Sequence, residues 1–285
     1  YADYVAYKLG VTPTIDLSVA GRTLAMDINT KAWSDEILSV ADIDPALLAQ
    51  PAQAGTAINT ICPTVAAELG LPKDVTVVTG GHDQPVCALG AGVVSPGIST
   101  DTTGTVECMT LVLDKPVLTA KMLGQGLPQY PNVVPDTYVL LAFVYSAGNV
   151  LKWYRDNFAQ AECARAEAEG RDIYDVLIGD APDRPVDVFL LPHFTGSGTP
   201  SLDSDSRGAL LGLQIGTKPG DVVRAILEGI AYEMRVNLDG VRAGDLPVER
   251  LNAIGGGAKS DCWTQLKADI TGLEIQAMEL SEAGC

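Results

Sequence analysis

The hydrophobic pattern of this chain is clearest in residues 218–241, where apolar side chains recur every three or four positions. That period is typical of a helix with one buried face. The residues on that face are Val222, Ala225, Ile226, Gly229 and Ile230.

A different pattern precedes the stretch "GGHDQ". The apolar run over residues 75–79 predicts a buried strand, and the small-residue run after Pro85 predicts a helix. Open α/β sheets place ligand chemistry at the carboxyl ends of their strands. His82, Asp83 and Gln84 stand at such a position, directly after two glycines.

Similar changes of period predict the other elements, and together they indicate an α/β protein. A boundary near Pro96 would give two units, residues 1–95 and 96–285. The predicted elements are a helix closed by Gly10, a helix capped by Ser34, a short helix over 63–71, a hairpin over 100–113, a strand and one long helix ending at Gly170, a strand over 250–257 and a helix over 261–272.

Composition narrows the possible partners. The 285 residues carry 19 Lys and Arg against 36 Asp and Glu, a net charge of −17. Nucleic acids and anionic membranes need a basic surface, so neither is expected as a partner. Backbone amides can still bind a phosphate on an acidic protein.

The cysteines, the histidines and the lengths of the apolar runs further limit the class of protein. Six cysteines without a C-x-x-C spacing predict reduced thiols in a cytoplasmic protein, and two histidines make a zinc site of the usual spacing improbable. No apolar run reaches the length of a membrane helix. The chain opens with "YADYVAYKLG" and without Met, so we expect a segment of something longer.

Three glycine clusters follow predicted strands, at Gly80-Gly81, in "TTGT" and in "AIGGGAKSDCW". None is a phosphate-binding loop of the G-x-x-x-x-G-K-[ST] type. The hydroxyls of Thr102, Thr103 and Thr105 around Gly104 suit a phosphate, although an ordinary hairpin turn is the alternative. The last cluster suits a nucleotide, or is a tight turn whose helix is capped by Ser260 or Asp261.

Asp83 is the leading candidate for a catalytic carboxylate. The glycines let the backbone turn sharply and present it in a cleft, and Gln84 could contact a hydroxylated substrate. Local pattern alone gives equal weight to a helix cap, since Pro85 fits the first turn of a helix. Three other acidic residues are interpreted as packing or surface residues, namely Glu107, Glu228 and Asp269.

The ordered set of motifs resembles the FGGY carbohydrate kinases. "GALLGLQIGTKPGDVVRAILE" is similar to the signature of the family's carboxyl-terminal domain, and the other matching blocks are "VTGGHDQPVCALGAG", "TTGTVE", "SAGNVLKWYRDNF", "LLPHFTGSGTP" and "IGGGAKSDCWTQLKADITG". The resemblance implies a ribonuclease H-like, actin-like ATPase fold. Residues 1–95 would be the carboxyl-terminal part of the first, sugar-binding domain, and residues 96–285 the second, nucleotide-binding domain, incomplete at its end. The two domains would enclose a ligand cleft.

The resemblance also implies roles for individual residues. Asp83 matches the base that takes the proton from the attacking sugar hydroxyl, while Gln84 and His82 match substrate-contacting positions. The nucleotide site would comprise Thr103, Gly104, Thr105, Gly148, Lys152, Gly256, Gly257 and Asp261.

The activity implied is ATP-dependent phosphorylation of a sugar, most like a pentulose such as xylulose, in a possible homodimer. The alternative is a non-catalytic sugar- or nucleotide-binding homologue. Family members are longer and open with a phosphate hairpin whose Asp organises Mg²⁺. We find no metal ligand to assign among the residues present, and we expect residues 1–285 alone to be inactive.

Overall fold

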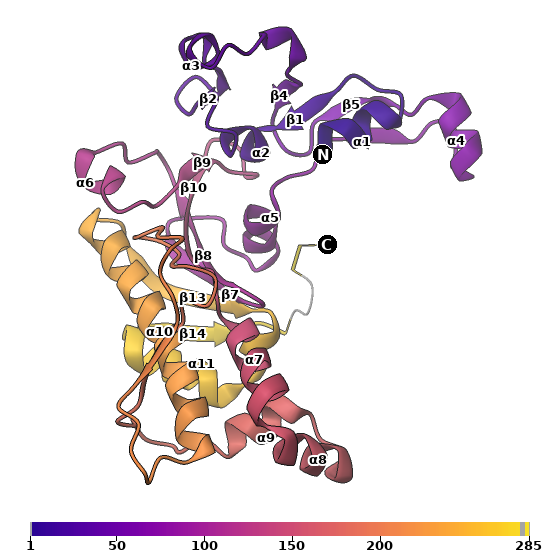
Figure 1. The fold of residues 1–285 in the computed structure, drawn as a ribbon. Helices are drawn as coiled ribbons and strands as arrows, with labels where there is room; N and C mark the ends of the chain where they lie inside the picture. The colour runs from indigo at the N-terminus through magenta and orange to yellow at the C-terminus, as the bar shows by residue number, and fades with distance from the viewer. Residues whose placement is uncertain (1, 280–282, 285) are drawn as a thin grey trace.

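A six-stranded mixed sheet forms the centre of the computed structural model, which describes residues 2–279 and 283–284 (Figure 1). Its strands lie in the order β14-β13-β7-β8-β10-β9. Strands β7, β8, β10 and β9 pair antiparallel, whereas β13 pairs parallel with both β7 and β14. Their bounds are β7 (Gly97–Thr103), β8 (Glu107–Leu113), β9 (Gln129–Pro131), β10 (Tyr138–Val144), β13 (Val248–Ile254) and β14 (Glu274–Ala277).

Two helices cover one face of this sheet, α10 (Pro219–Ala243) and α11 (Asp261–Thr271). Met109, Leu111 and Leu113 alternate along β8 and pack in one cluster with the α10 side chains Met234 and Leu238. Because successive strand residues point to opposite faces, the odd-numbered positions of β7 and β8 face these helices. Each such buried side chain contributes roughly 1.5–3 kcal/mol by leaving water.

The opposite face of the sheet packs against earlier parts of the chain. Val112 of β8 contacts Ala88 and Val93, at and beyond the end of α5 (Asp83–Gly90). Cys108 packs with Tyr130 of β9 in another cluster. The even-numbered positions of β8 are therefore buried as well, and the sheet lies between two packed layers.

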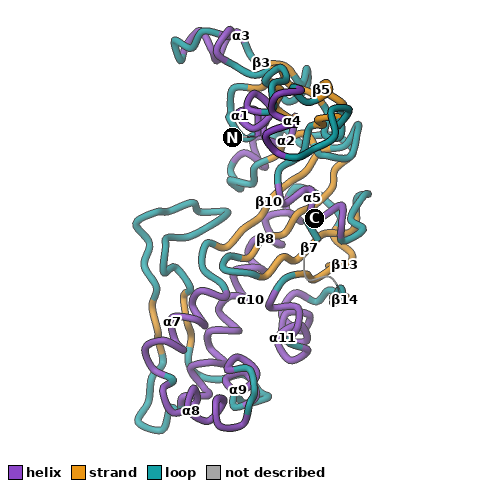
Figure 2. Tube along the Cα trace, turned by 90° about the vertical axis from the view of Figure 1, so that its right-hand side faces the viewer, coloured by secondary structure: helices purple, strands orange, loops and turns teal. Residues whose placement is uncertain are grey.

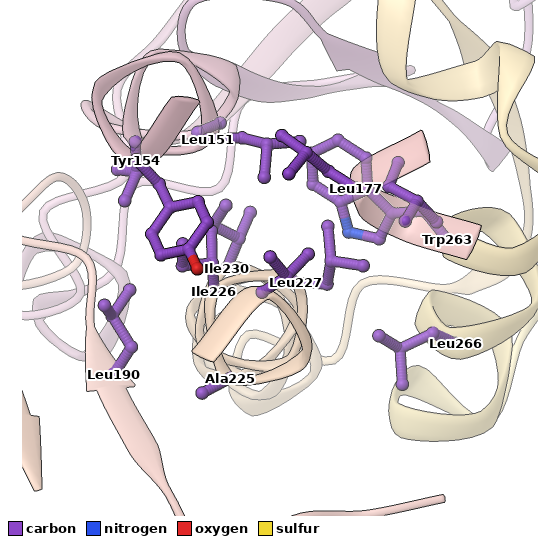
Figure 3. Packing of buried hydrophobic residues seen from close by; sticks show 14 of the residues in the cluster. Leu151, Tyr154, Leu177, Leu190, Ala225, Ile226, Leu227, Ile230, Trp263 and Leu266 are labelled. Atoms are coloured by element: carbon purple, nitrogen blue, oxygen red, sulfur yellow. The ribbon is translucent and has the colours of Figure 1, made fainter. Parts of the chain in front are cut away.

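A second core lies to one side of the sheet, where α10 meets three further helices (Figure 3). Leu151, Leu177 and Ile226 from three of these helices pack together, with Trp263 and Leu266 of α11 beside them. The elements not yet bounded are α6 (Ala120–Leu123), α7 (Gly148–Phe158), α8 (Gln160–Glu169), α9 (Ile173–Gly179), β11 (Phe189–Leu191) and β12 (Ala209–Leu211).

The first 80 residues form a region of short elements at the other end of the molecule (Figures 1 and 2). Its strands join only in pairs, β1 with β4, β2 with β3 and β5 with β6. The bounds are α1 (Ala2–Lys8), β1 (Thr14–Asp16), α2 (Leu17–Gly21), β2 (Met26–Asp27), β3 (Ala32–Trp33), α3 (Asp35–Val40), η1 (Pro45–Leu47), β4 (Gln50–Ala52), β5 (Ala57–Thr60), α4 (Pro63–Leu69) and β6 (Thr76–Val78).

The periodicity predictions hold for most elements. The long helix is α10, and Ser34 caps α3 by accepting a hydrogen bond from the Ile37 amide at 3.3 Å. The hairpin prediction is confirmed as β7 and β8, and Ser260, not Asp261, caps α11. Gly10 closes α1 with a φ of +80°, a conformation that glycine adopts readily.

Three predictions about local structure are wrong. The strand expected to be buried is β6, and Val78 in it is 53% exposed because β6 pairs only with β5 in a two-stranded ribbon. The single helix expected before Gly170 is two helices, interrupted at Ala159, where the backbone leaves helical geometry. The helix expected from Pro85 begins at Asp83. The Asp83 carboxylate accepts a hydrogen bond from the Gln84 amide.

The boundary near Pro96 stays a prediction. The two sides contact each other, since the Gln53 amide donates hydrogen bonds to the carbonyls of Asn132 and Val133 at 3.1 and 2.8 Å. Among the residues that the structure describes, no helix combines the length and the hydropathy that crossing a bilayer requires.

Candidate functional site

A cleft of about 690 Å³ opens where three loops meet at the end of the sheet. The loops are the turn between β7 and β8, the start of α7, and the 3-10 turn η2 (Gly256–Lys259); α9 and α11 complete the wall. Of the residues predicted to bind nucleotide, all but Asp261 line this cleft. Its lining comprises Thr103, Gly104, Thr105, Gly148, Asn149, Leu151, Lys152, Asp172, Tyr174, Asp175, Ile178, Gly256, Gly257, Lys259, Ser260 and Trp263.

The β7–β8 turn joins the start of α7 through backbone hydrogen bonds. The Gly148 amide donates to the Gly104 carbonyl at 3.0 Å, and the Ala147 amide donates to the Thr105 carbonyl at 3.1 Å. A Cβ on Gly148 would lie 2.5 Å from the Gly104 oxygen, closer than real contacts allow. Glycine is therefore required at position 148 because the two loops touch there, and this requirement does not depend on a ligand.

The glycine-rich loop after β13 lies against the same turn. A Cβ on Gly257 would be 2.5 Å from Thr103 Cγ2 and 3.1 Å from the Trp263 ring, whereas no atom lies within 4 Å of a Cβ on Gly256. Gly257 thus permits close packing between loops. Gly256 leaves an open backbone surface in the cleft, which suits the close approach of a flat ligand.

The three threonines of the turn do not present their hydroxyls equally. Thr103 is 2% exposed, and its Oγ1 points inward, where it accepts a hydrogen bond from Lys267 Nζ at 2.5 Å. Thr102 Oγ1 is buried and has no hydrogen-bond partner among the described residues. Thr105 is exposed. A ligand in the cleft would therefore meet the backbone of the turn and the hydroxyl of Thr105.

Beneath the turn lies a buried group of charges that the sequence interpretation missed. Lys267 Nζ donates a hydrogen bond to Asp101 Oδ2 at 2.8 Å and lies 3.1 Å from Glu107 Oε1, and each of the three residues is at most 3% exposed. Glu107 was interpreted as a packing or surface residue. The available signal was a single carboxylate in each of two strands that are otherwise uncharged.

Burial raises the pKa of Glu107 to about 8, and the neighbouring Asp101 carboxylate acts in the same direction while Lys267 opposes it. The Lys267 pKa is also raised, because two carboxylates outweigh the effect of its own burial. One ammonium group therefore lies between two buried carboxyl groups, and burial favours the protonated form of Glu107.

The remaining predicted nucleotide residues are polar and accessible. Lys152 is exposed on α7 and lines the cleft together with Lys259, Asp172 and Asp175. Asp261 is exposed as the first residue of α11 and lies outside the lining. The cleft therefore offers both signs of charge at its rim.

His82, Asp83 and Gln84 lie outside that cleft, at the start of α5. The Asp83 side chain is 76% exposed, and its Oδ1 accepts the Gln84 amide at 2.8 Å. Gln84 Oε1 is buried without a partner among the described residues. The N-cap position of α5 is His82 and Asp83 is the first residue of the helix, so the interpretation of Asp83 as the helix cap is wrong, and its carboxylate is presented to solvent.

His82 contacts the same oxygen of Asp83. His82 Nε2 lies 3.2 Å from Asp83 Oδ1, and His82 Nδ1 is 2.9 Å from the Tyr130 hydroxyl. Partial burial lowers the pKa of His82, although the Asp83 charge acts the other way. The backbone amide of His82 donates to Ser18 Oγ at 2.8 Å, so α2 and β9 together fix the ring.

A metal ion would find few ligands here. The described residues contain no group of three or more His, Cys, Asp and Glu side chains arranged to hold one. A bound Mg²⁺ would have to take its ligands chiefly from phosphates and water, which it commonly does.

Comparison with known proteins matches the whole chain. Residues 101–285 fit the model for the FGGY family of carbohydrate kinases, C-terminal domain, and residues 1–90 fit the model for its N-terminal domain. A gluconokinase of Bacillus licheniformis is 31% identical across 99% of this chain and 55% of that protein. A xylulose kinase of Staphylococcus epidermidis is 28% identical across 98% of this chain and 54% of that protein.

Solved structures agree on the fold. The ligand-bound xylulose kinase from Lactobacillus acidophilus superimposes with a TM-score of 0.85 at 23% identity, over 99% of this chain and 56% of the other. The predicted actin-like α/β fold is thereby confirmed. The chain spans about half the length of the curated relatives it matches.

Proposed function

Because the chain belongs to the FGGY family of carbohydrate kinases, we propose that it supplies the nucleotide cleft and the catalytic base for ATP-dependent phosphorylation of a sugar hydroxyl. The observation that carries this proposal is the gathering of the predicted nucleotide residues, Asp261 excepted, around one cleft. Those residues come from segments more than 150 positions apart, and nothing in their local patterns requires them to meet.

The cleft has the size and the chemistry for a nucleotide. Its volume of about 690 Å³ lies within the range of roughly 300–1,000 Å³ for small-molecule sites. The open backbone at Gly256 would lie against the adenosine. The exposed turn at Gly104 and Thr105 would hold the phosphates, and Lys152 would add positive charge. Mg²⁺ would arrive bound to ATP and be held mainly by phosphate oxygens.

Asp83 would act as the general base, which removes the proton from the attacking hydroxyl. Its exposed carboxylate is free to meet a substrate, and the contacts of its Oδ1 atom with His82 Nε2 and with the Gln84 amide limit its orientation. Gln84 and His82 would contact substrate hydroxyls. Phosphoryl transfer depends mainly on positioning and charge, so the sugar would lie between Asp83 and the cleft as the domains close.

For the substrate we propose a pentulose such as xylulose, with gluconate and glycerol as the competitors to be measured beside it. The relatives named above are kinases of gluconate and of xylulose, and their identities to this chain are similar. The alternative is a non-catalytic homologue that binds sugar or nucleotide. The exposed Asp83 carboxylate favours the enzyme, since a binding module has no need of a base.

The test is a panel of xylulose, ribulose, gluconate and glycerol with the full-length protein, measuring ADP formation in the presence and absence of each sugar. We expect sugar-dependent ADP release with at least one acceptor. ATP binding without turnover on any acceptor would favour the non-catalytic alternative. Residues 1–285 alone should bind nucleotide but release no ADP, because half of the relatives' length is not included. A homodimer and a cytoplasmic location stay predictions.

A further inference from the structure

The buried charge group beneath the β7–β8 turn has a geometry that neither the fold nor the proposed chemistry requires. Asp101 and Thr103 share one face of β7, and Glu107 stands opposite Thr103 in the β7–β8 register. Lys267 reaches all three side chains from α11 on that face. Its ammonium also lies 4.9 Å from the centre of the Trp263 ring, in cation–π contact.

Packing alone does not explain such a group. Removing charges from water is costly, and apolar residues of similar volume often stabilise a core as well or better. Lys267 is the one cation that the structure pairs, among the described residues, with Asp101 and with Glu107. The arrangement therefore indicates that a side chain must be held in one orientation at this place.

The side chain that the group orients is Thr103. Its hydroxyl accepts from Lys267 and lies 3.3 Å from Asp101 Oδ1, so the side chain is held inward from two directions. The methyl group is then left against Gly257, where a Cβ would come within 2.5 Å of it. The carbonyl of the next residue, Gly104, accepts a hydrogen bond from the Gly148 amide at the start of α7. All three loops of the cleft therefore depend on the position of Thr103.

We propose that Lys267, held between Asp101 and Glu107, is a positioning residue that fixes the β7–β8 turn through the Thr103 hydroxyl and so sets the affinity of the cleft for the phosphates of a nucleotide. The inference rests on the proposed function, since it names what tunes the same cleft. Lys267 touches no ligand in this scheme and acts only through Thr103.

The group also links nucleotide affinity to pH. Glu107 is faced by Asp101 from β7 and by Lys267 from α11. With Glu107 protonated, the charges beneath the turn cancel. When Glu107 loses its proton, near pH 8, one negative charge remains under the site of the phosphates and opposes their binding.

The first experiment uses two charge-balanced double variants of the full-length protein. Asp101→Asn/Lys267→Met removes one charge of each sign beneath the turn. Arg224→Met/Glu228→Gln does the same to a buried ion pair of α10, which has a separation of 2.7 Å and no residue in the cleft. We expect the first variant to raise the KM for ATP about tenfold, the factor that corresponds to one lost charge-assisted hydrogen bond, with the KM for sugar unchanged. The second should leave both KM values unchanged.

The second experiment needs only Glu107→Gln, which mimics the protonated carboxyl and so keeps the neutral-pH fold. The wild-type dissociation constant for ATP should rise above pH 8, and in Glu107→Gln that rise should disappear. Equal pH profiles, or equal changes of both KM values in the two double variants, would overturn the inference. A wild-type protein that neither binds ATP nor releases ADP would instead overturn the proposed function, and the inference with it, before any variant is compared.

Discussion

The sheet region from Gly97 onward and the region before residue 80 are built in opposite ways. In the sheet region, both faces of the β8 strand are covered, and Ile226 and Leu251 are fully buried. In the earlier region, Leu24, Val40 and Leu47 are 80–86% exposed and strands pair only in twos. Short pairs of strands are marginal on their own, so the earlier region depends on its contacts with the sheet.

The candidate chemistry follows the same division. The cleft proposed for nucleotide is assembled within the sheet region, where a continuous core fixes the loops. Asp83 stands at the junction, held by His82, which in turn contacts Ser18 from the first region and Tyr130 from the second. The position of Asp83, the proposed base, therefore depends on both regions, whereas the cleft depends on one.

The largest effect expected from this division is on catalysis. Asp83→Asn in the full-length protein should lower kcat by roughly 10²–10⁴, because the hydroxyl loses its general base. The dissociation constant for ATP, measured by calorimetry, should stay within twofold, since the cleft lies in the other region. Unchanged turnover would remove the base assignment, and a matching loss of ATP affinity would show that the two sites are not separate.

The next largest effect is on stability. Ile226→Ala should lower the free energy of unfolding by about 2–5 kcal/mol, the usual cost of a cavity in a packed core. Leu24→Ala, at a side chain that is 81% exposed, should change it by less than about 0.5 kcal/mol. Urea unfolding of the full-length protein measures both. Similar losses would mean that Leu24 is covered in the full-length protein.

A smaller loss is expected where two loops of the cleft touch. Gly148→Ala should cost about 1–3 kcal/mol, since the added Cβ forces backbone apart, and should weaken ATP binding. Gly179→Ala is the matched control, because an added Cβ there meets no atom within 4 Å. Thermal unfolding and ATP titration of the two variants give the comparison. A Gly148→Ala protein with wild-type stability and affinity would show that the loops are free to separate.

The last effect, small for each pH unit, concerns the pH dependence of stability. The folded-state pKa of Glu107 is raised to about 8 from its usual 4.5, so between these values the folded protein retains a proton that the unfolded chain has lost. The free energy of unfolding should therefore fall as pH rises through this window, by about 1.4 kcal/mol per pH unit at most.

Glu107→Gln should remove this slope between pH 6 and pH 8, while Glu228→Gln should keep it. Urea unfolding at each pH measures the difference. A slope that is the same in wild type and in Glu107→Gln would contradict the proton held beneath the turn.

Sequence patterns predicted best those elements whose signal lies within one helix or one hairpin. The α10 stripe and the β7–β8 hairpin were found because period and turn chemistry are local properties. The strand over residues 75–79 was found, but its burial was not, since exposure depends on which other elements cover a strand. Ala159 interrupts a helical pattern that contains no Gly or Pro, and no local signal marked that break.

The sequence by itself determined the family, through motifs whose order and spacing are specific, and with it the candidate residues for base, sugar and nucleotide. The tertiary structure decided which of these residues share a cleft, that Thr103 turns its hydroxyl away from it, and that Asp101, Glu107 and Lys267 meet beneath it. Those three residues are up to 166 positions apart. Their charges interact strongly only when strand register and helix packing bring them together and exclude water around them. No local sequence pattern reports that packing.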